Sequence, residues 1–118
     1  MTKIAILGAG SWGSGLSVVL AHSRRAHTIS LWVREPELAA SISATRENKK
    51  YLPGISIPEQ VLATTNLQEV LRQAPVVIGA LPSSHVRSVL SQAVPSISSD
   101  VILVSATKGL EPDRKSVV

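Results

Sequence analysis

The sequence contains no cysteine among its 118 residues. It can therefore form no disulfide, hold no Cys-ligated zinc or iron–sulfur centre, and use no thiolate nucleophile. This absence fits a reducing compartment, so we expect a cytoplasmic protein without a metal site. A chain of this length buries roughly two-thirds of the surface that its unfolded form exposes, so a single domain can fold without cross-links.

Aromatic side chains are almost as scarce, since the chain has only Trp12, Trp32 and Tyr51. A nucleic-acid surface needs stacking aromatics among clustered basic side chains. Here twelve Lys and Arg stand against eight Asp and Glu, for a formal net charge of +4, but the basic residues are scattered. We therefore expect no nucleic-acid partner, and the positive balance favours a small anionic partner, phosphate first.

Long apolar runs are also missing. The longest stretch without polar side chains is Ala74–Leu81, and it contains a proline and a glycine. A membrane-spanning helix needs about 20 apolar residues. Near the N-terminus, the apolar residues Ile4–Leu7 imitate the start of a secretory signal, but four glycines between positions 8 and 15 interrupt its apolar core. We predict neither a membrane span nor a signal peptide.

The remaining sequence alternates short apolar runs with segments of helical spacing, which is typical of a parallel sheet covered by helices. Strands are predicted at Lys3–Leu7, Thr28–Val33, Val61–Thr64, Val76–Ala80 and Val101–Ser105, and helices at Ser11–His22, Pro36–Ala44, Leu67–Gln73 and Ser84–Gln92. Right-handed crossovers then favour a doubly wound, mostly parallel α/β sheet of the Rossmann type, with strand order 3-2-1-4-5. A sixth strand is missing, so we expect part of a longer protein.

Residues 46–58 break the helical spacing and predict a long loop. Three positive charges, Arg46, Lys49 and Lys50, precede a Tyr-Leu-Pro-Gly segment. Loops of this length in compact domains are usually functional or mobile.

The clearest motif follows the first strand directly: Gly8-Ala9-Gly10-Ser11-Trp12-Gly13 opens the first helix. A strand, GxGxxG and a helix in this order form the dinucleotide-binding fingerprint. Gly8 makes the tight turn, Gly10 lets a pyrophosphate approach the backbone, and Gly13 lets the helix pack on the strand. The helix N-terminus adds unpartnered N–H groups and the positive end of a dipole.

The end of the second strand predicts the cofactor preference. Arg34 stands 21 positions after Gly13, where an NAD-specific site would place an acidic residue. An arginine suits a 2′-phosphate, so we favour NADPH over NADH. Glu35 directly follows it and offers the NAD role as the alternative.

Two later turns also fall at the ligand edge of the sheet. In Leu81-Pro82-Ser83-Ser84-His85, we interpret Ser and His as helix caps rather than catalytic groups, and expect Pro82 and Ser83 to line the cofactor groove. After the fifth strand, Lys108 precedes Gly109. From the residues alone, Lys108 suits a phosphate or carbonyl ligand and a plain surface position equally well.

Five segments together resemble the amino-terminal domain of bacterial-type NAD(P)-dependent glycerol-3-phosphate dehydrogenases. They are GAGSWG at 8–13, LWVRE at 31–35, NKKYLPGI at 48–55, LPSSHV at 81–86 and SATKGLE at 105–111, so the resemblance covers essentially the whole chain. It implies reduction of dihydroxyacetone phosphate to sn-glycerol 3-phosphate with NAD(P)H, for glycerophospholipid synthesis. Ketopantoate and pyrroline-carboxylate reductases share the glycines but should not show this Trp12 and Thr-Lys-Gly-Leu-Glu combination.

The resemblance also implies roles for single residues. Ser11, Trp12, Arg34 and Tyr51 would contact the cofactor, and Lys108 both cofactor and substrate. The general acid/base lysine of the family belongs to a helical carboxyl-terminal substrate domain, which this chain lacks, so residues 1–118 form an NAD(P)-binding domain that should not turn over substrate alone. Two possibilities are left undecided by the sequence. The protein can form a homodimer through the missing domain, and the chain can instead be a stand-alone NAD(P)-binding sensor.

Overall fold

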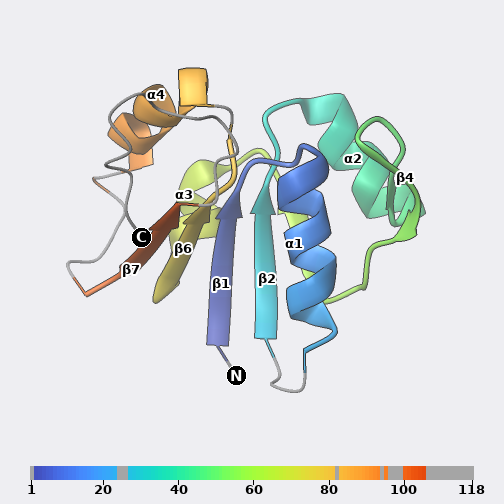
Figure 1. Ribbon diagram of the computed structural model, residues 1–118, viewed down its shortest axis with the longest axis horizontal. Coiled ribbons are helices and arrows are strands. Elements are labelled where there is room, and N and C mark those ends of the chain that lie inside the picture. The colour runs from blue at the N-terminus through green and yellow to red at the C-terminus, as the bar shows by residue number, and fades with distance from the viewer. Residues whose placement is uncertain (1, 24–26, 82, 94, 96–99, 106–118) are drawn as a thin grey trace.

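Five parallel strands form the central sheet of the computed structural model, which describes residues 2–23, 27–81, 83–93, 95 and 100–105 (Figure 1). The strands are β1 Thr2–Leu7, β2 His27–Trp32, β5 Val61–Thr64, β6 Val76–Gly79 and β7 Ile102–Ser105. Their order across the sheet is β5-β2-β1-β6-β7, which confirms the predicted doubly wound arrangement. All carboxyl ends meet at one edge, because neighbouring strands are parallel.

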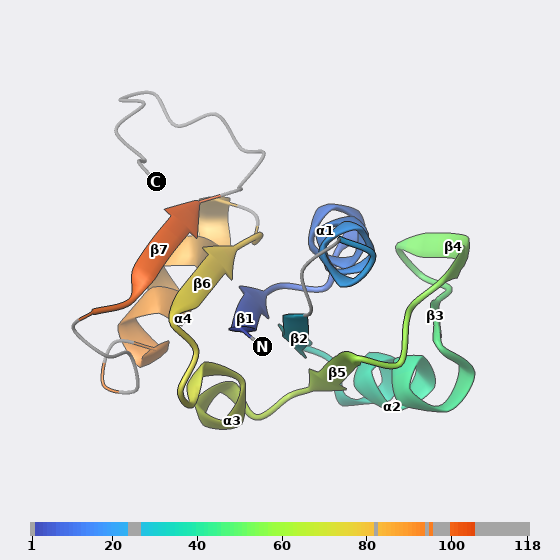
Figure 2. The same cartoon turned by 90° about the horizontal axis from the view of Figure 1, so that it is seen from below.

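In the described part of the chain, four helices cover the sheet: α1 Ser11–Ala21, α2 Pro36–Thr45, α3 Leu67–Leu71 and α4 Ser83–Ala93. Figure 2 shows α1 on one face of β1 and β2, and α3 on the opposite face. Pro36 begins α2, where its missing N–H costs nothing, and the Asn66 side chain caps α3 by accepting from the Glu69 N–H at 3.0 Å. None of the helices in these described segments is long and apolar enough to cross a bilayer.

Burial on both faces of β1 explains its nearly continuous apolar sequence. Ile4 and Ile6 belong to the core cluster that includes residues of α1 and α2. Ala5 and Leu7 belong to a second cluster, with residues of α3 and α4. Successive side chains of a strand point to opposite faces, so the part of a central strand that is covered on both sides, here residues 4–7, is apolar at every position.

The prediction of α3 was too long by two residues. The helix ends at Leu71 because Arg72 is extended (φ −62°, ψ 121°) and Gln73 adopts a positive φ of 56°. Neither signal is visible in the sequence, since both residues have good helix propensity.

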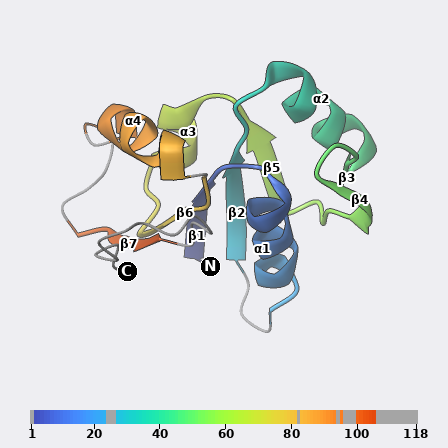
Figure 3. The same ribbon diagram turned by 45° about the horizontal axis from the view of Figure 1, so that its top comes forward.

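The predicted loop at 46–58 was also wrong in part, because it contains a small antiparallel pair of strands, β3 Glu47–Asn48 and β4 Leu52–Ser56. In Figure 3 this hairpin lies next to α2, at the opposite side of the molecule from β7. Arg46 ends α2 in the left-handed region (φ 58°), and its guanidinium donates to the backbone oxygens of Ile57 at 3.1 Å, Val61 at 2.8 Å, and Pro58. One of the three charges noted in this segment is therefore structural.

Lys3 of β1 caps the end of α3. Its ammonium donates to the backbone oxygens of Glu69 at 2.9 Å and Arg72 at 2.6 Å. Carbonyls at the end of a helix have no partner within it, so a cation there supplies one. Partial burial of the ammonium, with the positive charge of Arg72 nearby, lowers the pKa of Lys3.

Replacing Lys3 by methionine should lower the free energy of unfolding by about 1 kcal/mol, because two backbone oxygens lose a charged donor. Urea denaturation followed by circular dichroism measures this change. The control is Lys49→Met at an exposed lysine, where a change within about 0.5 kcal/mol is expected. Equal stability of the Lys3→Met variant and the wild type would show that the cap contributes nothing.

Candidate functional site

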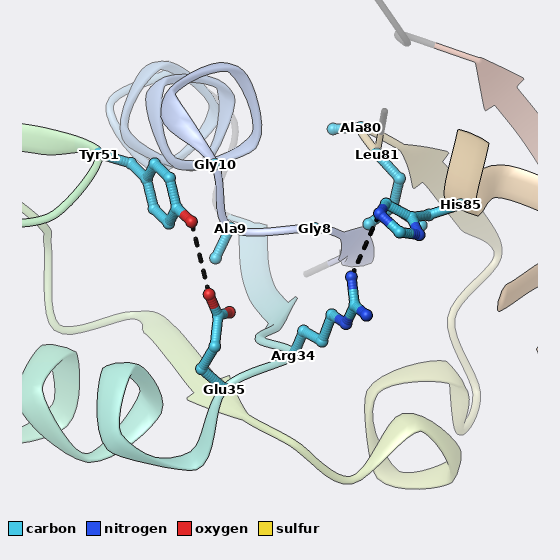
Figure 4. Close-up of a pocket in the computed structure, with 9 residues that line it drawn as sticks. All are labelled: Gly8, Ala9, Gly10, Arg34, Glu35, Tyr51, Ala80, Leu81 and His85. Atoms are coloured by element: carbon cyan, nitrogen blue, oxygen red, sulfur yellow. Dashed lines mark hydrogen bonds between the residues drawn. The ribbon is translucent and has the colours of Figure 1, made fainter. Parts of the chain in front are cut away.

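A pocket of about 230 Å³ opens at the carboxyl edge of the sheet, and we call it the glycine-loop pocket. Its lining residues follow β1, β2 and β6, with one residue from the β3–β4 hairpin and one from α4 (Figure 4): Gly8, Ala9, Gly10, Arg34, Glu35, Tyr51, Ala80, Leu81 and His85. Open α/β sheets bind their ligands at this edge, where neighbouring connections leave in opposite directions. The order β2-β1-β6 places that switch point beside β1.

Two glycines hold the turn between β1 and α1 by close packing. Gly8 has a φ of 119°, and a Cβ there would lie 2.7 Å from the Ala80 carbonyl oxygen and 2.9 Å from Leu81 Cδ2. At Gly13 a Cβ would collide with the Gly8 carbonyl oxygen. Both glycines therefore let backbone segments touch, as the fingerprint predicts.

Gly10 has a different role, because a Cβ there would meet nothing within 4 Å. The residue lines the pocket and forms the N-cap of α1, with no side chain capping the helix. The first-turn N–H groups of α1 thus border open space at the positive end of the helix dipole. This space fits a phosphate group in contact with the backbone, which any larger residue at position 10 would obstruct.

One side of the pocket carries a cation. Arg34 Nη1 lies 3.3 Å from His85 Nε2, and in Figure 4 the two side chains point toward each other near Gly8. Arg34 lies in the pocket wall directly after β2, at the edge of the sheet where we expected it, and its role toward a cofactor stays a prediction. His85 was interpreted as a helix cap, but it lies two residues inside α4 and lines the pocket instead. The sequence did offer a signal for this location, because His85 follows β6 closely and therefore lies near the carboxyl edge of the sheet.

The other side carries an anion held by two neighbours. Glu35 Oε2 accepts a hydrogen bond from the Tyr51 hydroxyl at 3.4 Å and forms an ion pair with Lys50 Nζ at 3.5 Å. Lys50 Nζ also lies 5.2 Å from the centre of the Tyr51 ring. The pKa of Lys50 is raised, mainly by its hydrogen bond with Tyr51 and to a smaller extent by its hydrogen bond with Glu35. The hairpin thereby brings an aromatic ring to the pocket and neutralises part of the Glu35 charge.

The other expected site residues divide into two groups. Ser11 and Trp12 begin α1 directly beside the pocket, and both are exposed, Trp12 with 45% of its surface. Pro82 and Lys108 lie outside the described residues, as does the side chain of Ser83. Leu81, the neighbour of Pro82, does line the pocket, a position that was not predicted for this apolar side chain.

The model of the family described as NAD-dependent glycerol-3-phosphate dehydrogenase N-terminus matches residues 3–118. A glycerol-3-phosphate dehydrogenase (NAD(P)+) from Koribacter versatilis is 45% identical over 111 residues, which are 94% of this chain and 33% of the relative. The solved glycerol-3-phosphate dehydrogenase of Coxiella burnetii superposes with a TM-score of 0.85 at 32% identity, over 95% of this chain and 34% of that one. The yeast Saccharomyces cerevisiae enzyme gives 0.83 at 26% identity, over 93% and 34%. The chain thus spans about a third of the length of these relatives.

Proposed function

The chain belongs to the NAD-dependent glycerol-3-phosphate dehydrogenase family, and we propose that it is the dinucleotide-binding domain of an enzyme reducing dihydroxyacetone phosphate to sn-glycerol 3-phosphate. The observation that carries this proposal is the glycine-loop pocket, where Gly10 leaves the start of α1 open to a phosphate. Gly10, Ser11 and Gly13 would hold the pyrophosphate through the backbone, and Trp12 and Tyr51 would contact the cofactor beside it. Gly8 would shape the turn under the cofactor, since its own N–H donates to the Trp32 carbonyl oxygen at 3.1 Å. The product would serve glycerophospholipid synthesis in the cytoplasm.

The two sides of the pocket support a preference for NADPH. In this fold the end of β2 meets the adenosine ribose of the cofactor. The Glu35 carboxylate there already accepts a hydrogen bond from Tyr51 and pairs with Lys50, which weakens its competition for a ribose hydroxyl. The Arg34 guanidinium faces an imidazole, which carries no fixed negative charge, so a 2′-phosphate offers it a stronger partner.

Substrate binding and turnover depend on more than the described residues. When bound, NAD(P)H supplies the hydride for the carbonyl carbon of the substrate. We propose that Lys108 contacts both the cofactor and the substrate, and that its positive charge neutralises the substrate phosphate. Pro82 would line the cofactor groove. The catalytic base would lie outside these 118 residues, in a substrate domain through which two copies would also pair. The 118-residue chain should therefore bind the cofactor without turning over substrate.

Tryptophan fluorescence tests the binding proposal. Trp12 begins α1 beside the pocket, and Trp32 ends β2, two positions before the pocket residue Arg34. Reduced nicotinamide absorbs at the wavelengths where tryptophan emits, so bound NADPH should quench their emission. We expect saturable quenching by NADPH, and by NADH at higher concentrations. N-acetyltryptophanamide at the same absorbance corrects for light absorbed by free cofactor. A linear decrease identical to that of this control, for both cofactors, would refute the proposal.

The alternative, a binding-only nucleotide sensor, predicts the same titration, so a second measurement separates the two. The family match favours the dehydrogenase. The natural gene product should have a mass close to that of the relatives and oxidise NADPH in the presence of dihydroxyacetone phosphate. If the natural gene product had the size of this chain, bound NADPH and lacked this activity, the sensor would be favoured.

A further inference from the structure

Asn48 of the β3–β4 hairpin is completely buried, although its side chain is polar. Its amide nitrogen donates to the Ala9 carbonyl oxygen at 2.8 Å and to Ser14 Oγ at 2.8 Å. Its amide oxygen accepts from the Tyr51 backbone N–H at 3.1 Å. The Ser14 hydroxyl in turn donates to the Ala9 carbonyl at 3.1 Å. Three segments, the glycine loop, α1 and the hairpin, thus meet at one side chain.

The chemistry of these partners fixes the orientation of the Asn48 amide. A backbone carbonyl can only accept, so the NH₂ group must face Ala9, and a backbone N–H can only donate, so the oxygen must face Tyr51. Asparagine is the residue whose short side chain offers two donors and an acceptor in this arrangement. Any smaller or apolar residue would leave the buried Ala9 carbonyl with one donor fewer.

The bond to Ala9 also determines where the next N–H group points. The Ala9 carbonyl and the Gly10 N–H belong to one planar peptide unit, and in a trans peptide they point in opposite directions. No described peptide bond is cis. Because Asn48 holds the carbonyl toward the interior, the Gly10 N–H points away from Asn48, and Gly10 lines the pocket. In this glycine-rich turn, the two side-chain donors to the Ala9 carbonyl oxygen, Asn48 at 2.8 Å and Ser14 at 3.1 Å, oppose rotation of the peptide.

We propose that Asn48 is a positioning residue of the dinucleotide site. It holds the peptide before Gly10 in the orientation that phosphate binding needs and fixes the start of the Tyr51 segment against the same loop. The backbone N–H groups at Gly10 and at the start of α1 therefore keep a constant distance from Tyr51, the aromatic residue that lines the pocket. This inference rests on the proposed binding of NAD(P) at the glycine-loop pocket.

The test uses the pH dependence of cofactor affinity in the Asn48→Asp variant of this 118-residue chain. Near pH 8 the carboxylate still accepts from Tyr51 but presents oxygen, not N–H, to Ala9, so NADP+ should bind about tenfold more weakly than to the wild type. Burial raises the pKa of such a carboxyl, and its protonation restores one donor. Toward about pH 5.5, the deficit relative to the wild type should therefore shrink. Calorimetry with acid-stable NADP+ measures the ratio at each pH.

Two further variants separate positioning from stability. Asn48→Ala should lose affinity by a similar factor but without recovery in acid, because alanine cannot regain a donor. Val70 of α3 packs in the same core cluster as Ala5 and Leu7. Val70→Ala removes buried volume there, so this variant should unfold more easily but bind NADP+ as the wild type does. All affinities are measured at a temperature where circular dichroism shows folded protein.

The inference is overturned if folded Asn48 variants bind NADP+ as tightly as Val70→Ala, or if the deficit of Asn48→Asp is independent of pH. If both Asn48 variants fail to fold, Ser14→Ala replaces them, because it removes one of the two side-chain donors to the Ala9 carbonyl and one acceptor of the Asn48 amide, and so loosens the same peptide. Normal affinity of Ser14→Ala would then contradict the inference. Absence of NADP+ binding by the wild type would refute the proposed function, and this inference with it.

Discussion

Replacing Gly10 by valine is expected to weaken dinucleotide binding by at least about 100-fold while leaving the fold intact, because the pyrophosphate would lose two or more charge-assisted hydrogen bonds. The structure allows the substitution, since a Cβ at this position meets no heavy atom within 4 Å and the backbone is extended (φ −72°, ψ −170°). The space that the valine side chain enters is the pocket itself. NADPH titration and far-ultraviolet circular dichroism measure the two halves of this prediction.

Gly15 provides a matched control within the same helix. A Cβ at Gly15 also meets nothing within 4 Å, but the residue does not line the pocket. Gly15→Val should therefore preserve NADPH affinity, and its helix propensity should slightly exceed that of glycine. If both variants retained wild-type affinity, the pyrophosphate could not lie against the start of α1.

Replacing Arg34 by aspartate should weaken NADPH binding by roughly 10- to 100-fold and NADH binding by much less. A guanidinium that pairs with the 2′-phosphate contributes about 1.5 to 3 kcal/mol, and NADH has no such group. Aspartate adds a repulsive charge for NADPH but can accept from the ribose hydroxyls of NADH. Calorimetric titration with each cofactor gives the two affinities.

The control for Arg34→Asp is the same change of charge at Arg72. Arg72 is exposed and follows α3, just before β6 begins, and so lies toward the amino ends of the strands, opposite the pocket. Arg72→Asp should leave the ratio of the two affinities unchanged. Equal losses for NADPH and NADH in Arg34→Asp would remove Arg34 from the 2′-phosphate role.

The sheet was predictable because its signals are local in sequence. The apolar run of Ile4–Leu7 identifies a strand buried on both faces, and the glycines after it identify the turn. Right-handed crossovers then left few arrangements for five parallel strands, and the structure has the predicted one. Arg34 followed from the same reasoning, since its distance from the glycines places it at the carboxyl edge.

The parts that the sequence did not predict depend on contacts between distant segments. Asn48 was read as part of a loop, because nothing local shows that its amide lies between Ala9 and Ser14, 39 and 34 positions away. The strand β4 was not predicted because it contains Pro53 and Gly54, and both residue types are rare in strand interiors. His85 belongs to the turn that the sequence placed at the carboxyl edge, but its contact with Arg34, 51 positions away, was not predictable from its neighbours.

The most direct test of the central claim is a crystal structure of this chain with NADPH. We expect pyrophosphate oxygens within about 3 Å of the backbone N–H groups at the start of α1, which is the distance of charge-assisted hydrogen bonds. The Ala9 carbonyl should still accept from Asn48 in that complex. NADPH bound elsewhere on the molecule, or a glycine-loop pocket filled by a protein side chain at saturating NADPH, would contradict it.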